Sequence, residues 1–347
     1  MPLAARRTFR FGFTVALSLA LAYGLAMPFP FFAPLFAVLL TTAPAPPLGL
    51  KGLLGLILLV LITLGVGLLL IPTLIHYPVS AVLTIAAGLY LSTYVTVGLG
   101  KGLIGLFLTV GFTMIPAAGL VDYGFAVALI EALVLGIVVA VISQWLVYPW
   151  FPEDPVLPSS GRPQPARGSE SGWIALRATL IVLPPVLLAF SNPSLYMPTI
   201  IKSVLLGQQG SMVSARAAGR ELLGSTFLAG CFAILFWFGL KIWPSLLMFF
   251  FWMLLFGIYF ASKLYGVIAT RFTASFWQNV AVTLLILLGP AVEDSAQGKD
   301  VFRAFAVRFG LFVAVTLYAW ISIVALERLR AGRRSRIRTS EPAAEAP

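Results

Sequence analysis

Three ionisable side chains stand inside otherwise apolar stretches of this chain: Glu131, Lys202 and Arg308. A charge at the centre of a bilayer costs about 2.5–3.5 kcal/mol on insertion scales, so each of them needs a partner or a function. A carboxylate can carry a proton, whereas a guanidinium or an ammonium can bind an anion. These three residues are therefore the first candidates for a transport pathway.

Gln278 and Asn279, at the start of another apolar stretch, are two further candidates. Their amides could line a polar pathway, or they could anchor a helix at the membrane interface. Lys202 is also open to two interpretations. Pro198 could interrupt its helix and leave an N-terminus that attracts anions, or Lys202 could lie near the inner interface and extend to water.

The sequence lacks the residues that most other kinds of chemistry require. The chain has one histidine and one cysteine, His76 and Cys231, which excludes a disulfide framework and a His or Cys metal cluster. The sequence contains neither a phosphate-binding G-x-x-x-x-G-K-[ST] motif nor an HExxH motif. We therefore expect no enzyme activity, no catalytic residue, no metal and no cofactor.

The composition indicates a membrane protein. Hydrophobic residues make up 60% of the chain and charged residues 10%, which excludes a soluble globular domain. Continuous Leu-rich runs of about 20 residues recur, and this length is typical of transmembrane helices rather than barrel strands. The predicted fold class is all-α. The net charge of +11 could suggest nucleic acid, but basic residues also fix membrane topology, so we expect no nucleic-acid partner.

A polar, Pro- and Ser-rich linker at residues 149–172 divides the chain. It separates a first membrane half, residues 1–148, from a second, residues 173–327, and a basic tail at 328–347 is expected to be disordered. Each half contains six apolar stretches. The predicted spans are 11–27, 31–43, 51–71, 79–97, 102–115 and 124–147, then 173–190, 195–206, 222–242, 245–265, 276–288 and 302–326.

Short matches in the same order indicate that the second half repeats the first. Examples are Pro78 with Pro244, Gly88 with Gly257, Thr109 with Thr283, Pro116 with Pro290, and 125–127 with 305–307. An even number of spans per half predicts about 12 transmembrane helices as two parallel six-helix repeats. The short stretches 31–43 and 195–206 could instead be re-entrant or broken helices.

Lysine and arginine residues gather on one side of this predicted topology. With the N-terminus inside, most of them fall in inner segments, as the positive-inside rule requires. We therefore expect both termini in the cytoplasm and a location in the bacterial inner membrane. In the same register Arg308 falls opposite Ala128, one turn from Glu131. The two charges could form a neutralised pair between the halves, or a gated site in which Glu131 exchanges a proton and Arg308 binds an anion.

Several stretches carry a family resemblance. Residues 219–226, 252–265, 276–283 and 289–294, together with 28–34 in the first half, resemble the fusaric-acid-resistance and aromatic-acid-exporter (FUSC-like) superfamily, most of all its compact proteobacterial branch. The resemblance implies proton-driven efflux of aromatic carboxylic acids and a periplasmic, HlyD-like membrane-fusion adaptor as partner. The sizeable cytoplasmic domains of the larger exporters have no counterpart here. No motif of the family assigns a functional residue.

Two functions follow as expectations. The first is an inner-membrane efflux transporter for aromatic carboxylic acids or related toxic organic anions. The second is a passive anion channel or a non-transporting membrane component of an efflux complex. Glycine-rich spans would also permit close contact between chains in a homo-oligomer.

Overall fold

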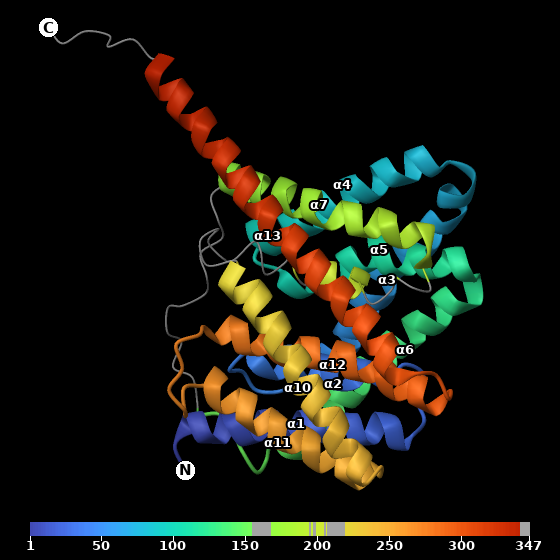
Figure 1. The fold of residues 1–347 in the computed structure, drawn as a ribbon, viewed down its shortest axis with the longest axis vertical. Coiled ribbons are helices and arrows are strands. Elements are labelled where there is room, and N and C mark those ends of the chain that lie inside the picture. The colour runs from blue at the N-terminus through green and yellow to red at the C-terminus, as the bar shows by residue number, and fades with distance from the viewer. Residues whose placement is uncertain (155–167, 194–195, 197–198, 205, 207–218, 341–347) are drawn as a thin grey trace, which may run out of the picture.

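The chain folds into a bundle of helices, and the computed structural model describes residues 1–154, 168–193, 196, 199–204, 206 and 219–340 (Figure 1). No strand occurs in these residues, so the predicted all-α class is confirmed for them. The elements are α1 (Leu3–Gly24), α2 (Phe32–Thr42), α3 (Leu50–His76), α4 (Pro78–Gly98), α5 (Gly102–Val121), α6 (Tyr123–Val147), α7 (Gly168–Ser191), the π-helix η1 (Gly219–Leu223), α10 (Gly224–Ile242), α11 (Leu246–Leu264), α12 (Ala274–Ala296) and α13 (Val301–Ser340).

Nine helices in the described part of the chain are long and apolar enough to cross a bilayer: α3, α4, α5, α6, α7, α10 with the end of η1, α11, α12 and α13. A helix of about 20 residues spans the hydrocarbon core, so this is a multi-pass membrane protein. The first helix, α1, is not among the nine. Its first turns contain Arg6, Arg7 and Arg10, whose charges make this part of the helix polar.

Helix α2 is too short to cross a membrane by itself. Its 11 residues rise about 16 Å, which is about half of the hydrocarbon thickness. Most of its side chains are buried, because it packs on α1, α6 and α12 within the bundle. The second predicted span is therefore a buried half-helix. Its predicted counterpart, 195–206, lies partly outside the described residues.

Two predicted helix ends are wrong because proline does not end these helices. Helix α5 continues through Pro116 to Val121, and α12 continues through Pro290 to Ala296. Neighbouring helices can satisfy the backbone groups that a proline frees inside a membrane bundle. The continuation of α12 places Glu293 and Asp294 on a helix, beyond the end of the predicted span 276–288.

The ends of the second half also differ from the prediction. Helix α7 begins at Gly168, inside the predicted linker, of which residues 155–167 lie outside the described part. Helix α13 runs on to Ser340, so most of the tail that we expected to be disordered is helical. Its Ala, Leu, Glu and Arg residues have high helix propensity and extend the last span.

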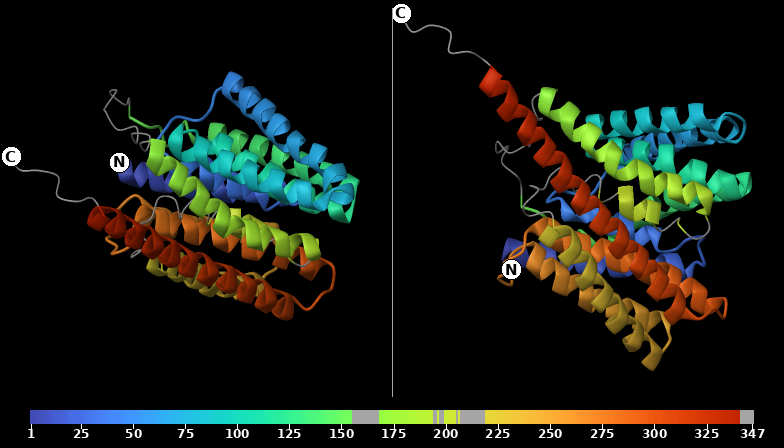
Figure 2. Two further views of the ribbon diagram at one scale, coloured as in Figure 1. Left: turned by 90° about the horizontal axis from the view of Figure 1, so that it is seen from above. Right: turned by 45° about the horizontal axis from the view of Figure 1, so that its top comes forward.

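The first helix of each half packs against a helix of the other half. Helix α1 lies along α11 of the second half, and α7 lies along α4 of the first half (Figures 1 and 2). A glycine contact lets α1 and α11 approach closely, since a Cβ atom on Gly257 would lie 3.2 Å from the Cα atom of Gly12. Helix α13 crosses the front of the bundle in Figure 1 and projects beyond it.

Helices α3 and α5 are in closest contact at Gly111, where a Cβ atom would lie 2.2 Å from the Thr63 carbonyl oxygen. We expect Gly111→Ala to force the helices apart and to destabilise the protein by about 1–3 kcal/mol. Gly55→Ala on α3 is the matched control, because its Cβ atom would meet nothing within 4 Å. Thermal denaturation of both variants in detergent measures the difference. Equal melting temperatures would contradict the close contact.

Candidate functional site

A cavity of about 780 Å³ opens at the end of the bundle opposite the N-terminus, and we call it the outer cavity, after the topology expected from the sequence. It lies between the halves, since α5, α6, the start of α2, α12 and α13 all contribute to its wall. The lining residues are Phe29, Phe31, Phe32, Met114, Val121, Phe125, Leu129, Pro193, Ile201, Ile286, Pro290, Glu293, Lys299, Asp300, Arg303, Ala304, Val307 and Arg308. The wall therefore combines aromatic rings with cationic and acidic groups, in a volume typical of small-molecule sites.

The aromatic side of the outer cavity is built by the turn between α1 and α2. Phe29 has a φ of +48°, a left-handed conformation that a bulky residue seldom adopts. Its ring lies 5.8 Å from that of Phe125 and 6.4 Å from that of Phe31, centroid to centroid. Phe31 packs closely on Gly289 of α12, where a Cβ atom would lie 2.4 Å from the Phe31 Cβ atom. The strained turn thus places a cluster of rings against α12.

The charged side is built by the end of α12 and the start of α13. Arg308 Nη2 donates to Asp294 Oδ2, and Lys299 Nζ lies 3.5 Å from Asp294 Oδ1. The Asp294 carboxylate is almost fully buried, with 8% of its side chain exposed. Among the described residues, Arg308 Nη1 and Glu293 Oε1 are buried without a hydrogen-bond partner.

This arrangement suits an anion with a flat apolar body. A guanidinium that keeps one donor nitrogen unsatisfied can bind a carboxylate, and the phenylalanine rings can pack on an aromatic ring. Asp294 holds Arg308 through its other nitrogen and so fixes the orientation of the guanidinium. Arg303 and Lys299 add positive charge to the wall of the cavity.

The predicted pair of Glu131 and Arg308 is not formed. Glu131 is exposed on α6, on the same stripe as the exposed Leu135 and Ile142, and it makes no ion pair among the described residues. Arg308 is occupied by Asp294 instead. The repeat predicted similar depths for the two residues, but depth does not determine the direction in which each side chain points around its helix.

Lys202 and Asn279 come together in the core, away from the outer cavity. Lys202 Nζ donates to Thr283 Oγ1 at 2.8 Å and lies 3.5 Å from Asn279 Oδ1. Asn279 Nδ2 in turn donates to Ser225 Oγ. Gln278, beside Asn279, is half-buried. The sequence had singled out Lys202 and Asn279 separately, without indicating that they meet.

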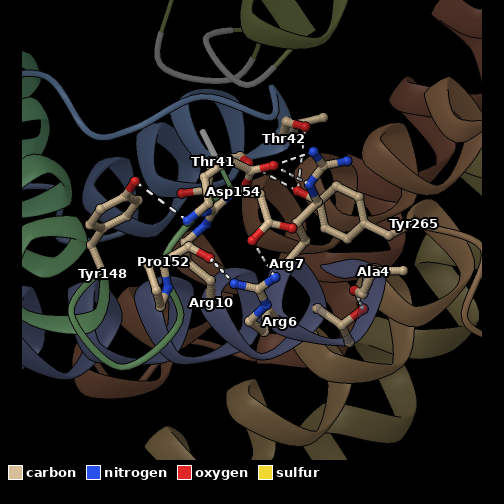
Figure 3. Close-up of polar contacts among 12 residues, drawn as sticks. Ala4, Arg6, Arg7, Arg10, Thr41, Thr42, Tyr148, Pro152, Asp154 and Tyr265 are labelled. Carbon is tan, nitrogen blue, oxygen red and sulfur yellow. Dashed lines mark hydrogen bonds and ion pairs between the residues drawn. The ribbon is translucent and has the colours of Figure 1, made fainter. Parts of the chain in front are cut away.

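A second charged cluster closes the opposite end of the bundle, and we call it the inner cluster. Arg10 Nη2 contacts Glu153 Oε2 at 2.7 Å, and Arg7 Nε contacts Glu153 Oε1 at the same distance. Arg6 binds Asp154 and the Pro152 carbonyl (Figure 3). The inner cluster ties the start of α1 to the segment that follows α6.

Contacts around the inner cluster join the two halves. The Tyr265 hydroxyl, after α11, donates to the Thr41 carbonyl at the end of α2, at 2.9 Å. A comparable ion pair occurs in the second half, where Arg177 Nη1 of α7 contacts Glu327 Oε1 of α13 at 2.6 Å. In both cases an arginine of the helix that opens a half is bound to a carboxylate close to the end of the same half.

The inner cluster determines the charge state of Glu153. Burial by itself would raise the pKa of this carboxyl. Hydrogen bonds from Arg7 and Arg10, and the charges of both guanidinium groups, outweigh burial and lower the pKa below its ordinary value of 4.5. Glu153 is therefore a carboxylate at neutral pH and neutralises the arginines around it.

Sequence reasoning missed Glu293 and Asp294 as site residues, as well as the phenylalanine cluster. The acidic pair falls after the predicted span 276–288 and was therefore not considered as part of a helix. The aromatic run at 29–32 carried a signal, since phenylalanines follow two prolines in a segment too short to span a membrane. The proximity of this run to Arg308 depends on contacts between distant segments.

Comparison with known proteins relates only the first half to a family. Residues 7–147 match the model of a family described as a protein of unknown function (DUF2955). No curated protein and no solved structure matches the chain. The matched region covers most of α1 to α6, and it carries no assigned activity.

Proposed function

We propose that this protein is a membrane transporter that binds an aromatic carboxylate, or a related organic anion, in the outer cavity and exports it. The observation that carries this proposal is the meeting of Arg308, with one unsatisfied guanidinium nitrogen, and the phenylalanine cluster in one cavity of about 780 Å³. The resemblance to aromatic-acid exporters points to the same class of substrate.

We also propose that the two halves are parallel repeats that enclose the transport path. The packing of α1 on α11 corresponds to that of α7 on α4. Helices α3, α5 and α6 pack on one another as α10, α12 and α13 do. A rocking motion of one repeat against the other would expose the path alternately at its two ends. The present arrangement, with the outer cavity open and the inner cluster closed, then corresponds to an outward-facing state.

The proposed orientation places the arginine-rich inner cluster in the cytoplasm and the outer cavity toward the periplasm of a bacterial inner membrane. A membrane potential that is negative inside favours the exit of an anion by about 2.3 kcal/mol per 100 mV. An HlyD-like adaptor would dock on the periplasmic side, where the outer cavity opens. This partner remains a prediction from the resemblance.

Efflux from liposomes tests the proposal. Benzenesulfonate is a suitable probe, because it stays ionised and does not leak through lipid as a neutral acid. We expect liposomes containing the protein to release labelled benzenesulfonate about tenfold faster than empty liposomes, and faster still with a potential negative inside. Benzoate should compete for the site better than cyclohexanecarboxylate does, because only benzoate has a ring that stacks on phenylalanine.

The exposed Glu131 supplies an internal control. Glu131→Gln should leave efflux and benzoate competition unchanged, since this side chain does not line the outer cavity. A large unitary current in planar bilayers would identify a channel instead. Release no faster than from empty liposomes would overturn the proposal.

A further inference from the structure

Lys202 lies in the short helical segment 199–204 and is completely buried, with 0% of its surface exposed. Its ammonium group would have no counter-charge there, because its hydrogen-bond partners among the described residues are the neutral Thr283 and Asn279. A buried charge without a partner is strongly unfavourable, whereas a neutral amine can still donate to the Thr283 hydroxyl. The arrangement is therefore suited to the uncharged lysine.

Among the described residues, the other side of this segment offers no compensating charge. Ile200, Ile201 and Val204 border a small space shared with α2, α5 and α6, and all of its lining residues are apolar. Ile201, next to Lys202 in the chain, also lines the outer cavity, whose charged groups include Glu293 and Arg308. Ile286 of α12 lines it too, and lies one helical turn, about 4.5 Å, from Thr283.

Polar groups continue from Lys202 toward the inner end. Asn279 donates to Ser225, whose hydroxyl donates to the backbone carbonyl of Glu221. The Glu221 carboxylate accepts hydrogen bonds from Thr273 and Ser275, at the start of α12. Glu221 lies in the π-helix η1, a distortion that often marks functional positions. We call this series, from Lys202 through Asn279 and Ser225 to Glu221, the polar track.

We propose that Lys202 is the proton-carrying group of the transport cycle and that the polar track is its exit toward the inner side. This inference rests on the proposed function. A proton from the outer side adds to the lone pair of the Lys202 amine and forms an ammonium group. When the inner end opens, the N–H bond breaks, and the proton passes to water or to the Glu221 carboxylate and leaves on the inner side. The amine is restored, so one proton enters per cycle.

The burial of Lys202 determines which conformation of the transporter protonation favours. Protonation places an unpaired charge in the closed core and therefore destabilises the outward-facing state. It favours the state in which water reaches the polar track. Loss of the proton to the inside permits return to the outward-facing state. Inward proton movement thus resets the transporter for another anion, and acid on the outer side accelerates the reset.

Two substitutions at Lys202 test the inference in the full-length protein in liposomes. Lys202→Met is always neutral and Lys202→Arg is always charged. Because benzenesulfonate takes up no proton, a pH dye inside the liposomes reports protons moved by the protein. We expect wild type to couple benzenesulfonate efflux to proton entry. The methionine variant should exchange benzenesulfonate within about threefold of wild type but move no protons, with exchange independent of pH between about 6 and 8.

A reporter cysteine distinguishes the two states. Val307 lines the outer cavity and is 44% exposed, so Val307→Cys in a Cys231→Ser background can be labelled from outside with an impermeant maleimide. We expect Lys202→Arg to slow this labelling and Lys202→Met to leave it unchanged or faster. Lys241→Met, at an exposed lysine of α10, is the matched control and should behave as wild type. Glu221→Gln should slow proton movement without slowing exchange.

These experiments distinguish failure of the proposed function from failure of the inference on Lys202. If wild type neither binds benzoate nor moves benzenesulfonate, the proposed function is wrong and the role of Lys202 falls with it. If wild type exports benzenesulfonate without proton movement, only the inference on Lys202 is overturned. The same conclusion follows if Lys202→Met moves protons as wild type does. Should the methionine variant fail to fold, the labelling of Lys202→Arg and the proton movement of Glu221→Gln decide the question.

Discussion

Arg308→Gln is expected to weaken benzoate binding by about 10- to 100-fold. A hydrogen bond to a charged group contributes about 1.5–3 kcal/mol, and a factor of ten corresponds to about 1.4 kcal/mol. The substitution removes the guanidinium that has an unsatisfied nitrogen and that lines the same cavity as the phenylalanine cluster. Titration of the purified protein with benzoate, by calorimetry or by competition with labelled benzenesulfonate, measures the loss.

Two controls separate loss of the binding group from structural damage. Arg303→Gln removes an exposed cation from the same cavity and should change affinity about fivefold at most. Arg308→Gln also leaves Asp294 without its arginine. In the double variant Arg308→Gln/Asp294→Asn the unpaired carboxylate is gone, so thermal stability should recover while binding does not. Benzoate affinity that survives in the double variant would exclude Arg308 as the anion-binding group.

Glu153→Gln is expected to destabilise the protein by about 3–5 kcal/mol, the cost of removing one partner from a buried ion pair. The Glu153 side chain is 3% exposed, and it binds both Arg7 and Arg10, of which Arg10 is 5% exposed. The substitution leaves these guanidinium groups without a carboxylate at the inner end. Denaturation in detergent at neutral pH should show a melting temperature lower by roughly 5–10 °C.

The neighbouring Asp154 provides the matched control. Its side chain is 55% exposed and binds Arg6, so Asp154→Asn should cost about 0–1 kcal/mol. The pH dependence gives a second check. Because the pKa of Glu153 is lowered in the folded protein, its contribution is complete above the ordinary value of 4.5 and is lost as the pH falls through the lowered value. A stability difference between wild type and Glu153→Gln that persists in strong acid would argue against the ion pair.

Residue types alone identified one member of the candidate site but not its partner. Arg308 stood out in the sequence because a charge within an apolar run needs a partner, and the structure places it in the outer cavity. Its partner was misjudged. The sequence favoured Glu131 through the repeat register, whereas Asp294 lies closer, because α12 continues past Pro290 and returns through a short turn to α13.

For Lys202 and Asn279, the sequence left two interpretations open and the structure decided between them. Both were candidates on composition, each with an interfacial alternative that burial in the core removes. That they share a cluster with Thr283 and Ser225 depends on α10 and α12 packing together around the segment 199–204. No local pattern predicts such a contact, because it joins side chains far apart in the chain.

The sequence by itself determined the membrane environment and the helical class. These properties follow from local quantities: apolar runs of bilayer length and the lack of backbone partners in lipid. Only the tertiary structure decided which charges meet. The packing of α1 and α7 against the opposite halves, the half-length α2 and the continuation of α12 set the directions of the side chains. A shift of one residue along a helix moves a side chain by about 100° around the helix axis. Neither hydropathy nor the repeat register indicates in which direction around the helix a side chain points. The outer cavity and its Arg308–Asp294 pair could therefore be found only from the packing of the helices.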